Sequence, residues 1–229
     1  MTSILHLDFD GHRLAYRVSG RGPALVVLSL YRRRADMVEA RLLSDRLQVF
    51  QIAPLGYGYS DPVPGYTGEQ LPDQILAVLD RHDVDRFVVW GYSKGGAMTL
   101  SIARATPRAA GLVCGGSTPD FLTPGILRQM DRRLPPDNAA RSLWSWHTSF
   151  DWSGEVSAMS CSRLFYWGSE DRQMARRLRR TSGQLTFQDV DFIEFPGLDH
   201  GGCSTPESME NPVVPTVADW ISRRLGPAW

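Results

Sequence analysis

The sequence predicts an α/β fold in which a mostly parallel sheet of eight strands is flanked by helices. Short runs made mostly of apolar residues recur along the chain, as expected of strands that are buried on both faces. Segments with apolar residues at helical spacing lie between these runs. The chain has 229 residues, enough for one large core, and its 42 % of hydrophobic and 22 % of charged residues are ordinary for a globular protein.

The first two predicted strands differ from the others because apolar and polar residues alternate along them. They lie at residues 4–8 and 13–18, and Asp10-Gly11 between them predicts the turn of a hairpin. A hairpin of this kind suits the edge of a sheet. Six apolar runs complete the set of strands, at residues 24–28, 49–53, 86–90, 111–114, 163–167 and 191–195.

Helical patterns alternate with these strands, most clearly at residues 72–81. The stretch 120–160 breaks the rhythm because it is longer than an ordinary connection. It contains a predicted helix at 122–133 and an aromatic segment at 143–152. We interpret it as a small lid that covers one end of the sheet, inserted in a single domain over residues 1–229. Further helices are predicted at 36–46, 95–105, 173–180 and 214–225.

The composition narrows the classes of function. The chain has 25 Lys and Arg against 25 Asp and Glu, so its formal net charge is zero, whereas a binder of nucleic acid or of anionic membranes normally carries a basic excess. No apolar run reaches the ~20 residues of a membrane helix, and the first ten residues do not resemble a secretory signal. The three cysteines have no C-x-x-C spacing, which predicts reduced thiols. We therefore expect a cytoplasmic protein without a metal or a cofactor.

Residues 91–95 read Gly-Tyr-Ser-Lys-Gly and match the pattern G-x-S-x-G. The pattern alone is weak, but its place directly after an apolar strand and before a helix is typical of a nucleophile elbow. Such a turn holds Ser93 in strained backbone geometry, and the glycines on either side leave room for neighbouring backbone. The helix N-terminus offers N–H groups to a developing oxyanion. The alternative is an ordinary glycine-rich turn.

Together with this motif, three others resemble those of the α/β-hydrolase family, and the resemblance covers nearly the whole chain. Residues 54–61, Pro-Leu-Gly-Tyr-Gly-Tyr-Ser-Asp, look like the family's glycine-rich turn after its fourth strand. Residues 167–171, Trp-Gly-Ser-Glu-Asp, look like its acid turn, and residues 197–201, Gly-Leu-Asp-His-Gly, look like its histidine loop. The order serine, acid, histidine is the order that this fold uses. The fold itself hosts many chemistries, so the resemblance implies no particular substrate.

The resemblance implies that Ser93 is the nucleophile, His200 its base and Asp171 the residue that orients the base. A serine hydroxyl needs a base within hydrogen-bond reach, and the base needs a partner that fixes its tautomer. Asp120, after the sixth predicted strand, is the alternative acid. Three other histidines are expected to be solvated, namely His6, His12 and His82.

The sequence departs from the family pattern after the third predicted strand. The family usually has His-Gly there, whereas this chain has Ser29-Leu30-Tyr31. The resemblance then assigns the oxyanion hole to the backbone N–H groups of Tyr31 and Lys94. Removing one such donor can cost ~10²–10³ in rate, so the geometry of this loop bears on how fast simple hydrolysis is.

Two segments bear on the substrate and the partner. The run Arg32, Arg33 and Arg34 is either a solvated turn or a contact for an anionic partner, for which the phosphopantetheine arm of an acidic acyl carrier protein is suitable. The aromatic residues of the insertion either anchor it to the domain or line an apolar acyl pocket. The candidate substrate-binding residues there are Trp144, Trp146 and His147.

These observations predict serine-dependent acyl chemistry, in the first place hydrolysis of an ester or thioester with a bulky or aromatic acyl group. The first alternative is an acyltransferase that moves an acyl group from a carrier-protein thioester to an acceptor. The departure at residues 29–31, the arginine run and the aromatic insertion favour this alternative. The second alternative is a non-catalytic binding protein that keeps the fold. Neither nucleic acid nor a membrane is expected as a partner.

Overall fold

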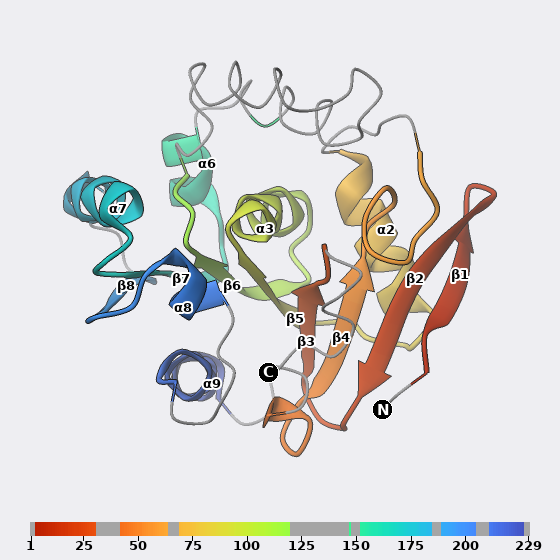
Figure 1. Ribbon diagram of the computed structural model, residues 1–229. Helices are drawn as coiled ribbons and strands as arrows, with labels where there is room; N and C mark the ends of the chain where they lie inside the picture. The colour runs from red at the N-terminus through yellow and green to blue at the C-terminus, as the bar shows by residue number, and fades with distance from the viewer. Residues whose placement is uncertain are drawn as a thin grey trace.

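The computed structural model describes residues 3–30, 42–63, 69–119, 147, 152–184, 189–204 and 211–226. Within these residues, eight strands form one sheet in the order β1-β2-β4-β3-β5-β6-β7-β8 (Figure 1). β1 pairs with β2 and β2 with β4 in antiparallel fashion, and the other neighbours are parallel. The strands are β1 (Leu5–Phe9), β2 (His12–Ser19), β3 (Ala24–Leu28), β4 (Gln48–Ala53), β5 (Phe87–Tyr92), β6 (Ala109–Gly115), β7 (Ser162–Gly168) and β8 (Val190–Phe195).

All eight predicted strands are present, and their ends fall within two residues of the prediction. The pattern was reliable because the central strands are covered on both faces. Every residue of β3 and of β6 is buried, as a parallel strand between two helical layers requires. The alternating strands β1 and β2 form the predicted hairpin at one edge of the sheet.

Helices cover both faces of the sheet (Figure 1). Buried residues of α2, α3, α6 and α7 belong to the core on one face, and those of α8 and α9 belong to the core on the other. None of the described helices is long and apolar enough to span a bilayer. The helices are α2 (Gln70–Asp80), α3 (Lys94–Ala105), α6 (Trp152–Ala158), α7 (Arg172–Gln184), α8 (His200–Ser204) and α9 (Val213–Leu225).

The helices depart from the prediction in two respects. Helix α7 continues four residues beyond the expected end at 180, because the buried residue Thr181 extends the stripe formed by Met174 and Leu178. The short helices α6 and α8 were not predicted. Most of the helix expected at 36–46 and most of the predicted lid lie outside the described residues, and so the lid stays a prediction.

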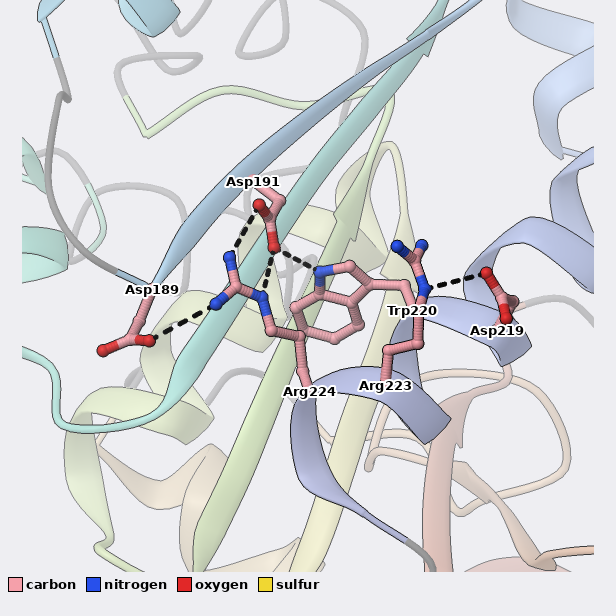
Figure 2. Close-up of polar contacts among 6 residues, drawn as sticks. All are labelled: Asp189, Asp191, Asp219, Trp220, Arg223 and Arg224. Atoms are coloured by element: carbon pink, nitrogen blue, oxygen red, sulfur yellow. Dashed lines mark hydrogen bonds and ion pairs between the residues drawn. The ribbon is translucent and has the colours of Figure 1, made fainter.

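One carboxylate fixes the C-terminal helix α9 to strand β8 (Figure 2). Asp191 Oδ2 accepts hydrogen bonds from Trp220 Nε1 at 2.6 Å and from Arg224 Nε at 2.8 Å, and Oδ1 accepts one from Arg224 Nη2 at 2.8 Å. Partial burial acts to raise the pKa of Asp191, but the hydrogen bonds from Arg224 and Trp220 outweigh it and lower the pKa. The first residues of β8, the strand that leads to the loop of His200, are therefore firmly attached to α9.

We predict that Asp191→Asn lowers the free energy of unfolding by about 1–2 kcal/mol at neutral pH, because the three charge-assisted hydrogen bonds to this partly solvated carboxylate are weakened. Folding lowers the pKa of Asp191, so the carboxylate contributes fully above the ordinary Asp pKa of about 3.9. The contribution is lost as the pH falls through the lower folded-state value. Urea unfolding at several pH values should show the gap between wild type and variant closing in acid.

The matched control is Asp219→Asn on the same helix. Asp219 forms an exposed i,i+4 ion pair with Arg223, and removing such a pair is expected to cost less than about 0.5 kcal/mol. Equal losses from the two variants would show that Asp191 is no more than another surface charge.

Candidate active site

Ser93 occupies a strained turn between β5 and α3. Its φ of 55° and ψ of −116° lie outside the regions that residues with a side chain normally adopt. The other non-glycine residues with positive φ in the described part of the chain are aspartates, which tolerate it better. The Ser93 N–H donates to the carbonyl oxygen of Gly115 at 2.8 Å, and its own carbonyl oxygen accepts from Ala97 N–H at 3.1 Å. The strand–turn–helix arrangement predicted for residues 91–95 is therefore present.

The glycines of this motif have different roles. A Cβ atom on Gly91 would collide with the carbonyl oxygen of Gly95, so a side chain there would push α3 away from β5. A Cβ on Gly95 would meet Leu28 and Leu30 at 3.8 Å, which is ordinary contact. The prediction that both motif glycines leave room for backbone is thus right for Gly91 and wrong for Gly95. Gly96 takes the second role, since a Cβ there would lie 2.9 Å from a carbonyl oxygen of β6.

Asp171 follows β7 and uses its two carboxylate oxygens for different purposes. Oδ1 accepts a hydrogen bond from Met174 N–H at 3.3 Å, in the first turn of α7. Oδ2 lies 2.5 Å from Nδ1 of His200. An ionised carboxylate can only accept, so Nδ1 of His200 carries the hydrogen and Nε2 presents a lone pair. The Asp171 side chain is only 11 % exposed, whereas that of His200 is 47 % exposed.

Backbone contacts join the turn that carries Asp171 to the loop that carries His200. Glu170 N–H donates to the carbonyl oxygen of Leu198 at 2.9 Å, and Ser169 Oγ accepts from Gly197 N–H at 2.9 Å. Glu170 itself is exposed, as expected. The two segments therefore form one unit beyond the ends of β7 and β8.

The loop then enters the short helix α8 at His200. Asp199 Oδ1 accepts from Gly202 N–H at 2.7 Å, so this aspartate caps the start of the helix. A Cβ on Gly168 would collide with the carbonyl oxygen of Leu198, so this glycine of the acid turn allows the loop to approach. His200 is thus held at a defined place by its own loop as well as by Asp171.

The imidazole of His200 lies beside the turn that carries Ser93. Its ring centroid is 5.0 Å from that of Tyr92, the residue directly before Ser93, and the two planes are inclined by 55°. Tyr92 ends β5, and Asp171 and His200 follow the ends of β7 and β8. The structure therefore gathers the three predicted residues at the carboxyl ends of parallel strands, where α/β folds place their ligands. No role was predicted for Tyr92, because its contact with His200 is not visible in the local pattern.

Other predicted site residues are only partly described. Lys94 is the first residue of α3 and half-buried, and a backbone N–H in a first helical turn has no partner within the helix. The backbone N–H of Lys94 is thus available, beside Ser93, to donate a hydrogen bond to an oxyanion. Several predicted residues lie outside the described part of the chain, namely Tyr31, Arg32, Arg33, Arg34, Asp120, Trp144 and Trp146.

His147 is buried, with 1 % of its surface exposed, and its ring stacks on Trp152 at 4.3 Å. Its carbonyl oxygen accepts a hydrogen bond from Trp152 Nε1, and burial lowers the pKa of His147 to about 3. A neutral imidazole packed in this way fits an anchor of α6, and its place in a substrate pocket stays a prediction. His82 is half-buried, so the expectation that it is solvated holds only in part: its Nε2 lies 3.3 Å from the Tyr16 hydroxyl and its ring packs edge-on against Phe50.

Comparison with known proteins agrees with this geometry. A family model described as the alpha/beta hydrolase fold matches residues 29–142, about half of the chain. A thermophilic esterase from Thermogutta terrifontis superposes with a TM-score of 0.71 at 17 % identity, over 97 % of this chain and 99 % of that one. The enol-lactonase from Burkholderia xenovorans LB400 gives a TM-score of 0.70 at 17 % identity, over 95 % and 100 %. Together with the sheet topology, these matches show that the chain belongs to the α/β-hydrolase fold superfamily.

A likeness in sequence covers a shorter stretch. The "Putative non-heme haloperoxidase" of Mycobacterium phage D29 is 30 % identical over 102 residues, which is 43 % of this chain and 37 % of that protein. The match thus spans little more than a third of that relative. The family model identifies the family, the solved structures show the fold, and the reaction depends on the residues of the site.

We predict that Gly91→Ala destabilises the protein by about 3 kcal/mol or more, because the new Cβ strikes backbone that cannot turn away. Gly95→Ala, four residues along the same motif, should change the free energy of unfolding by less than about 1 kcal/mol. Thermal and urea unfolding of the two variants measure the difference. Equal stability of Gly91→Ala and Gly95→Ala would contradict the close approach of α3 to Gly91 that the structure shows.

Proposed function

We propose that the protein is a serine hydrolase that cleaves an ester or thioester through an acyl-enzyme on Ser93. The observation that carries this proposal is the 2.5 Å contact between His200 Nδ1 and Asp171 Oδ2, made beside the strained turn of Ser93. The contact leaves Nε2 of His200 as the lone-pair nitrogen, which is the atom that a general base needs. Asp171 would stabilise the imidazolium formed when His200 takes the Ser93 proton.

The reaction would proceed in two halves. Ser93 Oγ attacks the acyl carbonyl carbon while His200 Nε2 takes the hydroxyl proton, and a tetrahedral oxyanion forms. The Lys94 N–H stabilises that oxyanion, with the N–H of Tyr31 as the second proposed donor. The intermediate collapses, the bond to the alcohol or thiol breaks, and His200 protonates the leaving group. Water activated by His200 then attacks the acyl-enzyme and releases the acid and Ser93.

A bulky or aromatic acyl group is proposed from the aromatic residues of the insertion, of which the structure describes His147 and Trp152. The names of the superposed esterase and enol-lactonase support an ester-cleaving reaction on this fold. Hydrolysis is preferred to acyl transfer because water needs no acceptor site of its own, and transfer from a carrier protein bound through Arg32, Arg33 and Arg34 stays the alternative.

We predict that Ser93→Ala abolishes hydrolysis of p-nitrophenyl esters, with a loss of at least ~10³ in kcat, because no nucleophile remains. The melting temperature should stay close to that of wild type, since alanine differs only by the hydroxyl oxygen. Steady-state assays measure the loss of kcat, and thermal unfolding measures the melting temperature. Hydrolysis that survives in the folded variant would rule out the acyl-enzyme on Ser93.

We predict that Asp171→Asn lowers kcat by ~10²–10⁴, because the amide no longer selects the imidazole tautomer that presents a lone pair to Ser93. Asparagine is also a good helix cap, so α7 and the stability should be preserved. The matched control is Glu170→Gln, which removes the neighbouring exposed charge and should leave kcat within about threefold. An unchanged kcat in Asp171→Asn would exclude Asp171 and favour Asp120 as the acid.

A further inference from the structure

Two tyrosines meet over the end of strand β6. Tyr92 from β5 and Tyr166 from β7 have ring centroids 5.8 Å apart, with planes inclined by 40°. The last residue of β6 and the next are glycines. A Cβ on Gly115 would collide with the ring of Tyr166, and a Cβ on Gly116 would collide with that of Tyr92. The two rings therefore fill the space that side chains at these positions would otherwise take.

Buried partners hold this tyrosine pair in place. Trp90 Nε1 donates to the Tyr166 hydroxyl at 3.0 Å, and Phe195 packs edge-on against the Tyr166 ring at 5.8 Å. Trp90, Tyr166 and Phe195 are each no more than 4 % exposed. The ring of Tyr92 thus lies against Tyr166 of β7, which its buried neighbours leave little freedom to move.

Two contacts fix the orientation of the His200 imidazole, one with Asp171 and one with the ring of Tyr92. The Nδ1 contact with Asp171 sets one direction, but a single hydrogen bond leaves a half-exposed ring able to turn about it. A flat ring at 5.0 Å between centroids limits that rotation. The place of Nε2 relative to Ser93 therefore depends on Tyr92 as well as on Asp171.

The ring of Tyr92 has this effect, and the hydroxyl is not needed for it. The hydroxyl oxygen is buried and forms no hydrogen bond with any described residue. Burial, with Cys203 and Asp171 adding to it, raises the pKa of Tyr92, so the phenol stays neutral near neutral pH. A neutral, unpaired hydroxyl offers nothing to His200 that a phenylalanine ring would lack.

We propose that Tyr92 is a positioning residue that holds the His200 imidazole in the orientation in which Nε2 faces Ser93. This inference rests on the proposed function of Ser93 and His200. Position 92 then requires a residue with a flat ring. The two consecutive glycines at the end of β6 leave the space that this ring and that of Tyr166 occupy. A misplacement of the base by about 1 Å can cost ~10² in rate, so loss of the ring should act on kcat.

The test compares variants of Tyr92 with a core aromatic remote from the site. Tyr92→Leu should lower kcat by ~10–100-fold with KM within about twofold, and Tyr92→Phe should keep kcat within about threefold of wild type. Phe50→Leu removes a fully buried ring from β4 and measures the general effect of a weakened core. Tyr92→Met, whose unbranched and flexible side chain adapts better to an irregular space, replaces Tyr92→Leu if the latter does not fold.

A second readout does not depend on activity. The proton on Nδ1 of His200 should give a far-downfield NMR signal, which is assigned by its loss in Asp171→Asn. We expect the signal to persist in Tyr92→Phe and in Phe50→Leu, and to broaden or vanish in Tyr92→Leu.

The outcomes separate this inference from the proposed function. If hydrolysis depends on Ser93 but Tyr92→Leu keeps both its kcat and the NMR signal, Tyr92 does not position His200. The same follows if Phe50→Leu loses kcat to an equal extent. If wild-type hydrolysis does not depend on Ser93, the proposed function fails, and the NMR comparison still decides whether Tyr92 orders the imidazole.

Discussion

The sharp reversal of the chain at Ser93 is the constraint on which the site depends. Helix α3 returns over the end of β5 so closely that Gly91 admits no side chain, and Ser93 takes a positive φ that its side chain disfavours. Such strain costs of order 1–3 kcal/mol and persists only where the surroundings enforce it. Here β5 and β6 are buried almost throughout, and the Ser93 N–H is bonded to the end of β6. The rigid sheet thus keeps a small residue at the carboxyl edge in a conformation that it would not adopt alone.

The other proposed groups are brought to this edge by contacts that serve more than one purpose. Asp171 caps α7 with one oxygen and orients His200 with the other, so a structural and a chemical role share one carboxylate. The loop of His200 is bonded to the turn of Asp171, and β8 before it is tied to α9 through Asp191. The ring of Tyr92 packs against the His200 imidazole, and Tyr166 packs against Tyr92 in turn. The contacts that build the fold at this edge thus also place the groups of the proposed chemistry.

The sequence was a good guide wherever a pattern was local. The apolar runs predicted β3 and β6 because both faces of these strands are covered, and the motif at residues 91–95 predicted the turn because its strand and helix are adjacent in the chain. The order of motifs predicted the meeting of His200 with Asp171, which needs only that parallel strands end at one edge.

What the sequence could not indicate depends on contacts between distant segments. The tolerance at Gly95 follows from side chains of residues 28 and 30, and the partner of Tyr92 comes from a loop more than one hundred residues later. Helix α8 has only five residues with two glycines among them, so it carries no periodic signal, and Asp199 stabilises its start. Local patterns also placed His82 in solvent, whereas it packs on two aromatic residues of the neighbouring strands.

The central claim is that Ser93 carries the acyl group, and its most direct test is the mass of the protein during turnover. Wild type and Ser93→Ala would each be mixed briefly with an aromatic acyl thioester, quenched in acid and analysed as intact protein and as peptides. The account predicts one added acyl group on wild type, located on the peptide that contains Ser93, and none on Ser93→Ala. An equal adduct on both proteins, or release of free acid at the same rate by wild type and by folded Ser93→Ala, would contradict it.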